Sequence, residues 1–259
     1  MNYVIGGWTQ SLQDLAPPTF SYVMYGMVTN LEGLTTGTPS SPSWSPASNP
    51  TPPANGQVTW TYGGAGCTPP GMPSTSSYID AILDATNMNG WAGVDFDDEC
   101  NMNVDGLIQT MGALQPMQTS YTFLAGWNYN NPGSSPEGQA TNEAVMQIAV
   151  TGVANRMVLM CYGDAMWSMP DIENNVGPAI QRTIENGVPP KQVILALTPH
   201  GLNEENLNYF LDQIINYDIG GLFIWDFPAL SPSDLNTIEQ RLVQLGESNP
   251  PDFYRNFRD

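Results

Sequence analysis

The chain has 259 residues, of which 25 are Asp or Glu and only 6 are Lys or Arg, so its formal net charge is −19. Charged residues make up 12% of the chain, about half the share of an average domain, so the negative charge reflects missing basic residues more than surplus acid. A surface of this kind repels phosphate backbones, which argues against a nucleic-acid partner, and no apolar run approaches the roughly 18–20 residues of a membrane span.

The predicted strands are short apolar runs rich in β-branched and aromatic residues. Eight of them recur at fairly even intervals, at residues 3–7, 22–28, 57–62, 93–97, 121–125, 157–162, 192–197 and 221–225. Amphipathic helical patterns lie between most of them or follow them, at residues 76–88, 104–114, 137–153, 172–186, 203–216 and 233–245. This alternation predicts an α/β fold in which residues 1–259 form one (β/α)8 TIM barrel, a fold that commonly has about 250 residues.

Residues 30–56 depart from the pattern, because they are rich in Pro, Ser, Thr and Gly and have no helical period. They stand where the second helix of the barrel is expected, so we predict a long loop in its place. Such loops are often functional, and this one follows a strand, on the face where barrels hold their active sites. Trp44 within it would either contact a substrate or anchor the loop. Residues 246–259 are expected to form a surface tail.

The stretch Gly93-Val94-Asp95-Phe96-Asp97-Asp98-Glu99 is the strongest functional signal in the chain. Side chains alternate between the faces of a strand, so Asp95, Asp97 and Glu99 share one face, roughly 6–7 Å apart. Three carboxylates so close cannot all ionise freely, and at least one pKa must rise. A carboxylic acid that stays protonated near neutral pH can act as a general acid.

The acidic stretch has two other interpretations, a solvated loop and a calcium site. Acidic runs are usually solvated loops, and that alternative remains open on the sequence of the run alone. A calcium loop counted from Asp95 requires Gly at its sixth position, where Cys100 stands, so calcium binding by that motif is not expected. His200 is the single histidine, which argues against a zinc centre and against any catalytic triad not built on His200. We expect no metal and no cofactor.

Further motifs, together with this one, resemble those of glycoside hydrolase family 18, which contains chitinases and endo-β-N-acetylglucosaminidases. The family signature Asp-Gly-x-Asp-x-Asp-x-Glu aligns with residues 92–99, and Gly63-Gly64 is similar to its Gly-Gly motif. Met160-Cys161-Tyr162 is similar to its Met-x-Tyr motif, and residues 220–225 to its eighth strand, which ends in Trp. The resemblance extends from the third strand to the eighth.

The resemblance implies a substrate-assisted retaining mechanism, in which the sugar's own 2-acetamido oxygen is the nucleophile. Glu99 would be the general acid and base, Asp97 would hold the acetamido N–H, and Asp95 would share a proton with Asp97. Tyr162 would donate its hydroxyl near the acetamido oxygen, and Trp225 would form the floor of the sugar pocket.

Other site residues are expected from their places near strand ends. Trp8 and Trp127 are predicted to stack on sugars, and Tyr25 either lines the pocket or fills the barrel. Asp164 is a candidate for the Asp that often follows the Tyr of the Met-x-Tyr motif, because Gly163 occupies that place here. Ala92, in place of the first Asp of the signature, removes a carboxyl that would interact with Asp95.

The functional prediction is an endo-acting hydrolase of β-1,4-linked N-acetylglucosamine, most simply a chitinase. The alternatives are an endo-β-N-acetylglucosaminidase acting on the chitobiose core of N-glycans and a non-catalytic chitinase-like lectin. The expected partner is chitin or an N-acetylglucosamine oligosaccharide, bound by a monomer. The N-terminus has no signal-peptide core, so the chain is either a secreted domain without its leader, which we favour, or cytosolic. The three cysteines allow one bridge at most, and Cys67 and Cys100 are either bridged or free.

Overall fold

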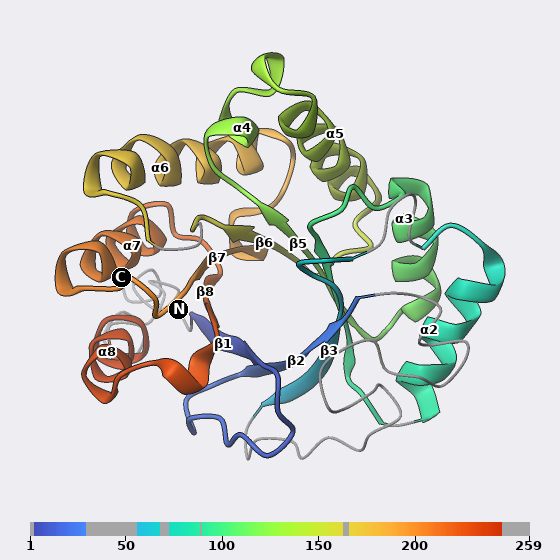
Figure 1. Cartoon of the computed structure of the whole chain (residues 1–259), viewed down its shortest axis with the longest axis horizontal. Coiled ribbons are helices and arrows are strands. Elements are labelled where there is room, and N and C mark those ends of the chain that lie inside the picture. The colour runs from blue at the N-terminus through green and yellow to red at the C-terminus, as the bar shows by residue number, and fades with distance from the viewer. Residues whose placement is uncertain (1–2, 30–55, 68–72, 89, 163–165, 245–259) are drawn as a thin grey trace, which may run out of the picture.

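In the computed structural model, residues 3–29, 56–67, 73–88, 90–162 and 166–244 are described. Eight parallel strands pair in chain order and close into a barrel (Figure 1). This arrangement confirms the predicted fold class. The strands are β1 Val4–Thr9, β2 Tyr22–Val28, β3 Gln57–Gly63, β4 Gly93–Asp98, β5 Gln118–Leu124, β6 Arg156–Met160, β7 Val193–Leu197 and β8 Gly221–Trp225.

Helices surround most of the barrel, and their bounds lie close to those expected from the sequence (Figure 1). They are α2 Ser76–Met88, α3 Val104–Leu114, α4 Trp127–Asn130, α5 Pro136–Thr151, α6 Met169–Glu185, α7 Glu204–Asn216 and α8 Pro232–Ile238, which continues as a π-helix over Glu239–Gln244. Residues 10–21, which join β1 to β2, form a loop without a helix. The predicted loop at residues 30–56, with Trp44, and the tail at 246–259 lie outside the described residues, except for Gly56.

Helix ends follow the capping chemistry that their sequences contain. Asn203 precedes α7, and its side chain accepts hydrogen bonds from the backbone N–H groups of Glu205 and Asn206, while Asn206 returns a bond to the Asn203 N–H. Asn103 precedes α3 and accepts from the Gly106 N–H at 2.7 Å. Each cap satisfies donors that the first turn of a helix leaves free. The cap at Asn103 also fixes where the loop that leaves β4 ends.

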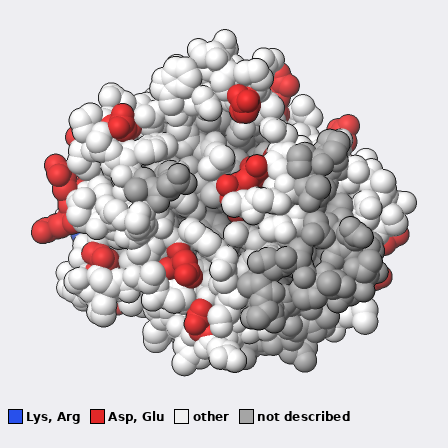
Figure 2. All heavy atoms as spheres, viewed as in Figure 1, with Lys and Arg blue, Asp and Glu red and all other residues white. Residues whose placement is uncertain are grey.

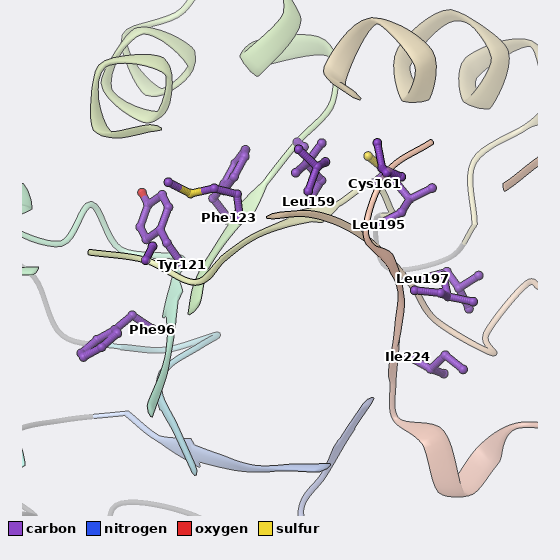
Figure 3. Close-up of a cluster of buried hydrophobic side chains, with 14 of the residues drawn as sticks. Phe96, Tyr121, Phe123, Leu159, Cys161, Leu195, Leu197 and Ile224 are labelled. Carbon is purple, nitrogen blue, oxygen red and sulfur yellow. The ribbon is translucent and has the colours of Figure 1, made fainter. Parts of the chain in front are cut away.

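The strands are buried on both faces, and alternate residues enter two different cores. Outward side chains pack against the helices, and Figure 3 shows eight of them on the helix-facing side of the strands: Phe96, Tyr121, Phe123, Leu159, Cys161, Leu195, Leu197 and Ile224. Inward side chains fill the barrel itself, among them Trp8, Met24, Val158, Met160, Ile194, Ala196 and Phe223. The inward positions of β4 therefore decide which groups face the barrel interior.

The fifth strand begins at Gln118, three residues before the predicted start at residue 121. Thr119 and Ser120 are polar and therefore did not fit an apolar run, yet both are buried. Ser120 can lie inside the barrel because its hydroxyl has a hydrogen-bond acceptor there, the Asp95 carboxylate. The sequence pattern missed these residues because their polarity is satisfied by distant partners, Asp95 on β4 for Ser120 and the loop residues Val153 and Asn155 for Thr119.

Arg156, at the start of β6, lies in a second polar cluster inside the barrel, with Gln118 and Tyr22. Both terminal nitrogens of its guanidinium donate to Gln118 Oε1, at 3.1 and 2.8 Å, and the guanidinium stacks 3.7 Å from the centre of the Tyr22 ring. Arg156 is 7% exposed, and the cavity that remains around this cluster is about 10 Å³, about enough for one water molecule. This end of the barrel interior is filled.

The surface carries the imbalance of charge seen in the sequence. Figure 2 shows acidic side chains scattered over the displayed face with very little basic surface between them, and a group of acidic atoms beside a hollow near its centre. Among the described helices, none is both long enough and apolar enough to cross a membrane.

Candidate active site

Strand β4 carries two of the three predicted carboxylates into the barrel, and the third follows its last residue. Asp95 and Asp97 alternate with Val94 and Phe96, which pack outward in the core between strands and helices. Asp95 is fully buried and Asp97 is 4% exposed, whereas Glu99 is exposed. The carboxyl groups thus run from the barrel interior toward its mouth, as the spacing of two predicts.

Asp95 is held by four hydrogen-bond donors from three other strands. Its Oδ1 accepts from the hydroxyls of Ser120 and Thr122, both at 2.6 Å. Its Oδ2 accepts from Trp8 Nε1 at 2.9 Å and from the Thr61 hydroxyl at 3.0 Å. Burial raises the pKa of Asp95, and these four bonds oppose that rise because they stabilise the ionised form.

Asp97 has a different environment, because one of its oxygens is buried without a partner. Its Oδ1 accepts no hydrogen bond from the described residues. Burial raises the pKa of Asp97 well above its ordinary value, and the nearby charges of Glu99, Asp95 and Asp98 raise it further. We expected Asp95 to share a proton with Asp97, but the Asp95 oxygens are occupied by four other donors. Asp97 is therefore the carboxyl best placed to hold a proton.

Glu99 is exposed at the barrel mouth, but the surrounding residues screen its carboxyl partly from water. Its withdrawal from water raises the pKa of its carboxyl, a hydrogen bond from the backbone N–H of Ala65 lowers it, and the charge of Asp98 raises it. The net direction is upward, which favours the protonated acid at a higher pH than for a free glutamate. The sequence-based expectation that at least one pKa in this group rises agrees with these directions.

Asp97 and Glu99 line a pocket of about 610 Å³, a volume within the usual range for small-molecule sites. The structure brings Trp8, Tyr162 and Trp225 to the same pocket, as the sequence predicted. Burial raises the pKa of the Tyr162 hydroxyl well above its ordinary value, and the charges of Asp97 and Glu99 add to that rise, so Tyr162 remains a donor. The full lining consists of Trp8, Met27, Ala65, Asp97, Glu99, Leu124, Met160, Tyr162, Thr198, His200 and Trp225.

Trp8 lies in the pocket with a more specific role than the predicted stacking. It is 2% exposed, its ring meets Phe223 edge to face at 5.6 Å between centroids, and its N–H is bound to Asp95. Little of the ring is free to stack on a ligand. Trp8 therefore acts mainly as a wall of the pocket and as a donor to the buried carboxylate.

One predicted pocket residue, Tyr25, needs correction, and one predicted stacking residue, Trp127, lies outside the pocket lining. Tyr25 is 2% exposed and packs against Trp91 at 5.9 Å between ring centroids, in the core between strands and helices. It points away from the barrel interior because it has the opposite parity to Met24, which points inward. Trp127 is 57% exposed at the start of α4 and does not line the pocket. Asp164 lies outside the described residues.

Several lining residues were not predicted to line the pocket, although Met160 belongs to the Met-x-Tyr motif and His200 was noted as the single histidine. Met160 and Thr198 continue the inward parity of β6 and β7, so strand register alone would have found them. His200 follows β7 by three residues, and its place just after a strand end was the signal that could have identified it. Met27, Ala65 and Leu124 are small or apolar and gave no chemical signal.

The question left open about the cysteines is answered by the structure. Cys67 and Cys100 form a disulfide with their Cα atoms 5.8 Å apart, and Cys161 is a free, buried thiol. Within the described part of the chain, no group of three or more His, Cys, Asp or Glu side chains is arranged to hold a metal ion. The ionisable side chains in the pocket lining are carboxyl, phenol and imidazole groups.

Comparison with known proteins gives a likeness in structure but not in sequence. No protein-family model matches the chain, and no curated protein sequence matches it. A fungal endo-β-N-acetylglucosaminidase of glycosyl hydrolase family 18 superposes with a TM-score of 0.61 at 16% identity, over 92% of this chain and 95% of that one. A chitinase from Chromobacterium violaceum gives 0.62 at 8% identity, over 93% and 99%.

A third similar structure is a chitinase-like agglutinin from Robinia pseudoacacia, with a TM-score of 0.58 at 12% identity, over 92% of this chain and 98% of that one. Two of these three similar proteins are hydrolases and the third is an agglutinin. At these identities the likeness shows a shared fold. It confirms, for the fold, the predicted resemblance to glycoside hydrolase family 18. Fold alone does not choose between the functions.

Proposed function

We propose that the chain is a retaining glycoside hydrolase of β-1,4-linked N-acetylglucosamine polymers, most simply an endo-acting chitinase. The observation that carries the proposal is that Asp97 and Glu99, two positions apart in the sequence, both line a pocket of about 610 Å³. Tyr162 and Trp225 belong to the same lining. Both carboxyls have a raised pKa. A protonated acid beside a second carboxyl is what glycosidic cleavage requires.

In the first step, Glu99 transfers its proton to the glycosidic oxygen as the C1–O bond breaks. The 2-acetamido oxygen of the same sugar forms a new bond to C1 from the opposite face, which gives an oxazolinium ion with inverted configuration at C1, and the second displacement restores the original configuration. Asp97 accepts a hydrogen bond from the acetamido N–H through its unprotonated oxygen, and the negative charge shared by the Asp95–Asp97 pair stabilises the positive charge. Tyr162 donates its hydroxyl near the acetamido oxygen, and Trp225 packs on the apolar face of the sugar.

In the second step, a water molecule attacks C1 and the oxazolinium ring opens. Glu99, now ionised, accepts the proton of that water, which restores the acid for the next cycle. The overall reaction adds one water across the glycosidic bond and needs no electron transfer. Asp95 stays ionised within its four donors, and its charge favours protonation of Asp97.

The decisive experiment compares two substrates for the same enzyme. Incubation with N-acetylglucosamine oligomers of four to six units, followed by chromatography of the products, tests the chitinase proposal. Incubation with a high-mannose glycoprotein, followed by a shift in electrophoretic mobility, tests cleavage of the N-glycan core. Cleavage of oligomers alone is the expected result. Cleavage of the glycoprotein alone would replace the chitinase with the second candidate, an endo-β-N-acetylglucosaminidase.

That second candidate is favoured by a specific observation, the sequence Asp95-Phe96-Asp97-Asp98-Glu99, which suits the endo-β-N-acetylglucosaminidase branch. The fungal endo-β-N-acetylglucosaminidase also matches nearly the full length of the chain. A binding protein without activity is the third candidate, because the first Asp of the signature is Ala92. Tight oligosaccharide binding by calorimetry with no turnover over days would establish it and refute the enzyme.

We further propose that the protein works outside the cytosol as a monomer, with a neutral carbohydrate as its partner rather than a nucleic acid. The Cys67–Cys100 bridge supports this location, because disulfides persist mainly in oxidising compartments. The charge of −19 supports a neutral ligand over a phosphate polymer. Size-exclusion chromatography with light scattering at several concentrations measures the oligomeric state, and a stable dimer would contradict the proposal.

A further inference from the structure

A tight turn directly after β3 lies against the general acid. The Cys67 N–H donates to the Gly64 carbonyl at 3.0 Å, which closes a four-residue turn over residues 64–67. Gly66 has a φ of +85°, while Ala65 has a negative φ, and this combination is that of a type II turn. Such a turn fixes the direction in which the N–H of its second residue, Ala65, points.

The turn is tied to the backbone around Glu99 at two places. At its first residue, the Gly64 N–H donates to the Asp97 carbonyl at 2.8 Å. At its last residue, Cys67 forms the disulfide with Cys100, which directly follows Glu99. The turn and the end of β4 are therefore joined covalently on one side of Glu99 and by a hydrogen bond on the other.

The loop behind Glu99 is braced separately by Asp98. Its Oδ1 accepts from the backbone N–H groups of Cys100 at 3.3 Å and Met102 at 2.8 Å, and its Oδ2 accepts from the Tyr121 hydroxyl at 2.8 Å. These bonds hold the backbone of the loop but do not contact the Glu99 carboxyl. The Glu99 carboxyl instead accepts a hydrogen bond from the backbone N–H of Ala65, the residue that the turn presents to it.

We propose that the Cys67–Cys100 disulfide is a positioning device for Glu99, which holds the Gly64–Cys67 turn so that the Ala65 N–H fixes the orientation of the Glu99 carboxyl. Its catalytic consequence rests on the proposed function, whereas its structural consequence does not. The disulfide thereby makes the activity of the site dependent on redox state. Under reducing conditions the turn loosens and Glu99 samples orientations in which its proton does not reach the glycosidic oxygen.

The sign of the pH effect follows from the groups that surround Glu99. Asp97 and Asp98 end β4, the strand that precedes Glu99, Tyr162 follows β6 and His200 follows β7, and none of these residues is part of the disulfide. An N–H donor stabilises the carboxylate, so losing the Ala65 bond raises the pKa of Glu99. The basic limb of the activity profile then moves to higher pH, because Glu99 keeps its proton longer.

The main experiment replaces both bridged cysteines, as Cys67→Ser with Cys100→Ser. We expect kcat on a chito-oligosaccharide to fall by roughly 10- to 100-fold, while KM changes by less than about threefold, because a misplaced acid affects the reaction more than binding. A matched control is Ile214→Val, which loses one buried methylene in α7, far in the chain from the site. It should lower the melting temperature with unchanged kcat and pH profile.

A second variant removes only the donor and keeps the bridge. Ala65→Pro suits the second position of a type II turn, where proline is common, yet it has no N–H. We expect this variant to keep its disulfide and its fold by circular dichroism, and to show the same fall in kcat and the same upward shift of the basic limb. Unchanged kcat and limb in both variants would overturn the proposal and leave the bridge with a role in stability alone.

A measurement that does not need activity separates this proposal from the proposed function. Carbon-13 NMR of labelled glutamate carboxyls, with Glu99 assigned by its loss in Glu99→Gln, gives the pKa of Glu99 in oxidised, reduced and Ala65→Pro protein. A higher pKa in the last two supports the positioning role even if no glycan is cleaved. An unchanged pKa refutes it even if the wild-type protein is an active chitinase.

Discussion

Two polar clusters inside the same barrel differ in how fully their polar groups are hydrogen-bonded and in how much space is left around them. In the Arg156 cluster, the guanidinium, Gln118 and Tyr22 satisfy one another, and the space left is about 10 Å³. In the pocket beside β4, one oxygen of Asp97 has no hydrogen-bond partner among the described residues, and the pocket volume is about 610 Å³. Buried polar groups are costly unless they are hydrogen-bonded, so an unpartnered carboxyl next to open space marks a place prepared for a ligand.

The comparison also separates two kinds of buried charge. Asp95, with four donors, resembles the Arg156 cluster more than it resembles Asp97, although it is only two residues away in β4. Burial raises the pKa of all three carboxyls, but four hydrogen bonds oppose that rise only at Asp95, so Asp97 and Glu99 are the better placed to exchange protons. We therefore expect substitutions in the pocket to affect reaction rates and substitutions in the Arg156 cluster to affect stability.

The largest expected effect is that of Glu99→Gln, which keeps the size of the side chain and removes its proton. Loss of one general acid should lower kcat on chito-oligosaccharides by roughly 10²- to 10⁴-fold, while oligosaccharide binding by calorimetry persists. Glu143→Gln, a change at an exposed site on α5, is the matched control and should leave kcat unchanged. Full activity in Glu99→Gln would remove Glu99 from the mechanism.

The pH profile tests the proton assignment. Glu99 must be protonated to act, so activity is lost as pH rises through its raised pKa, and it is lost at low pH as a second proton enters the Asp95–Asp97 pair. The profile of kcat/KM should be a bell with its optimum at roughly pH 4–6.5, given carboxyl reference values near 4. Asp97→Asn should lower the bell and shift or flatten it. A wild-type profile that is flat from pH 5 to 9, or peaks above pH 8, contradicts the assignment.

Arg156→Met should affect stability without affecting catalysis. It removes two charged hydrogen bonds and leaves Gln118 Oε1 short of donors, so the free energy of unfolding in urea should fall by about 1–3 kcal/mol. At 25 °C, kcat/KM should stay within about twofold. Arg241→Met, which breaks a partly exposed ion pair with Asp212, is the control and should cost less than about 1 kcal/mol. A large loss of kcat/KM in folded Arg156→Met would contradict the claim that the Arg156 cluster affects stability alone.

The smallest effects are expected among the tryptophans. Trp225→Ala opens the pocket lining and should raise KM for chito-oligosaccharides by about tenfold, since burying a large apolar side chain contributes roughly 1.5–3 kcal/mol. Trp127→Ala, at an exposed position outside the lining, should change KM by about twofold or less. Initial-rate kinetics on oligomers of two lengths measure both. A larger effect of Trp127 on the longer oligomer would extend the binding surface beyond the pocket.

Strand parity explains which predicted site residues were found. Asp95, Asp97 and Glu99 were placed together because alternation within one strand is a local property. Tyr25 was misplaced because its parity has meaning only once the register of β2 against β1 is known, where it pairs with Thr9. A single step along β2, from Met24 to Tyr25, moves a side chain from the barrel interior to the helix-facing core.

Contacts between distant segments lay beyond the sequence for a different reason. Nothing local to Cys67 or Cys100 says that their Cα atoms come within bridging distance, because that depends on β3 and β4 being neighbours in the barrel. The four donors of Asp95 come from β1, β3 and β5, and as isolated residues they look like ordinary Trp, Thr and Ser.

The sequence by itself determined the alternating elements, the barrel that they predict and the strand that carries Asp95 and Asp97 on one face. Each of these depends on periodicity and composition within a few neighbouring residues. Only the tertiary structure decided which carboxyl is fixed and which is free to carry a proton. That distinction depends on burial and on hydrogen-bond donors delivered by other strands, which a pattern along one segment does not contain.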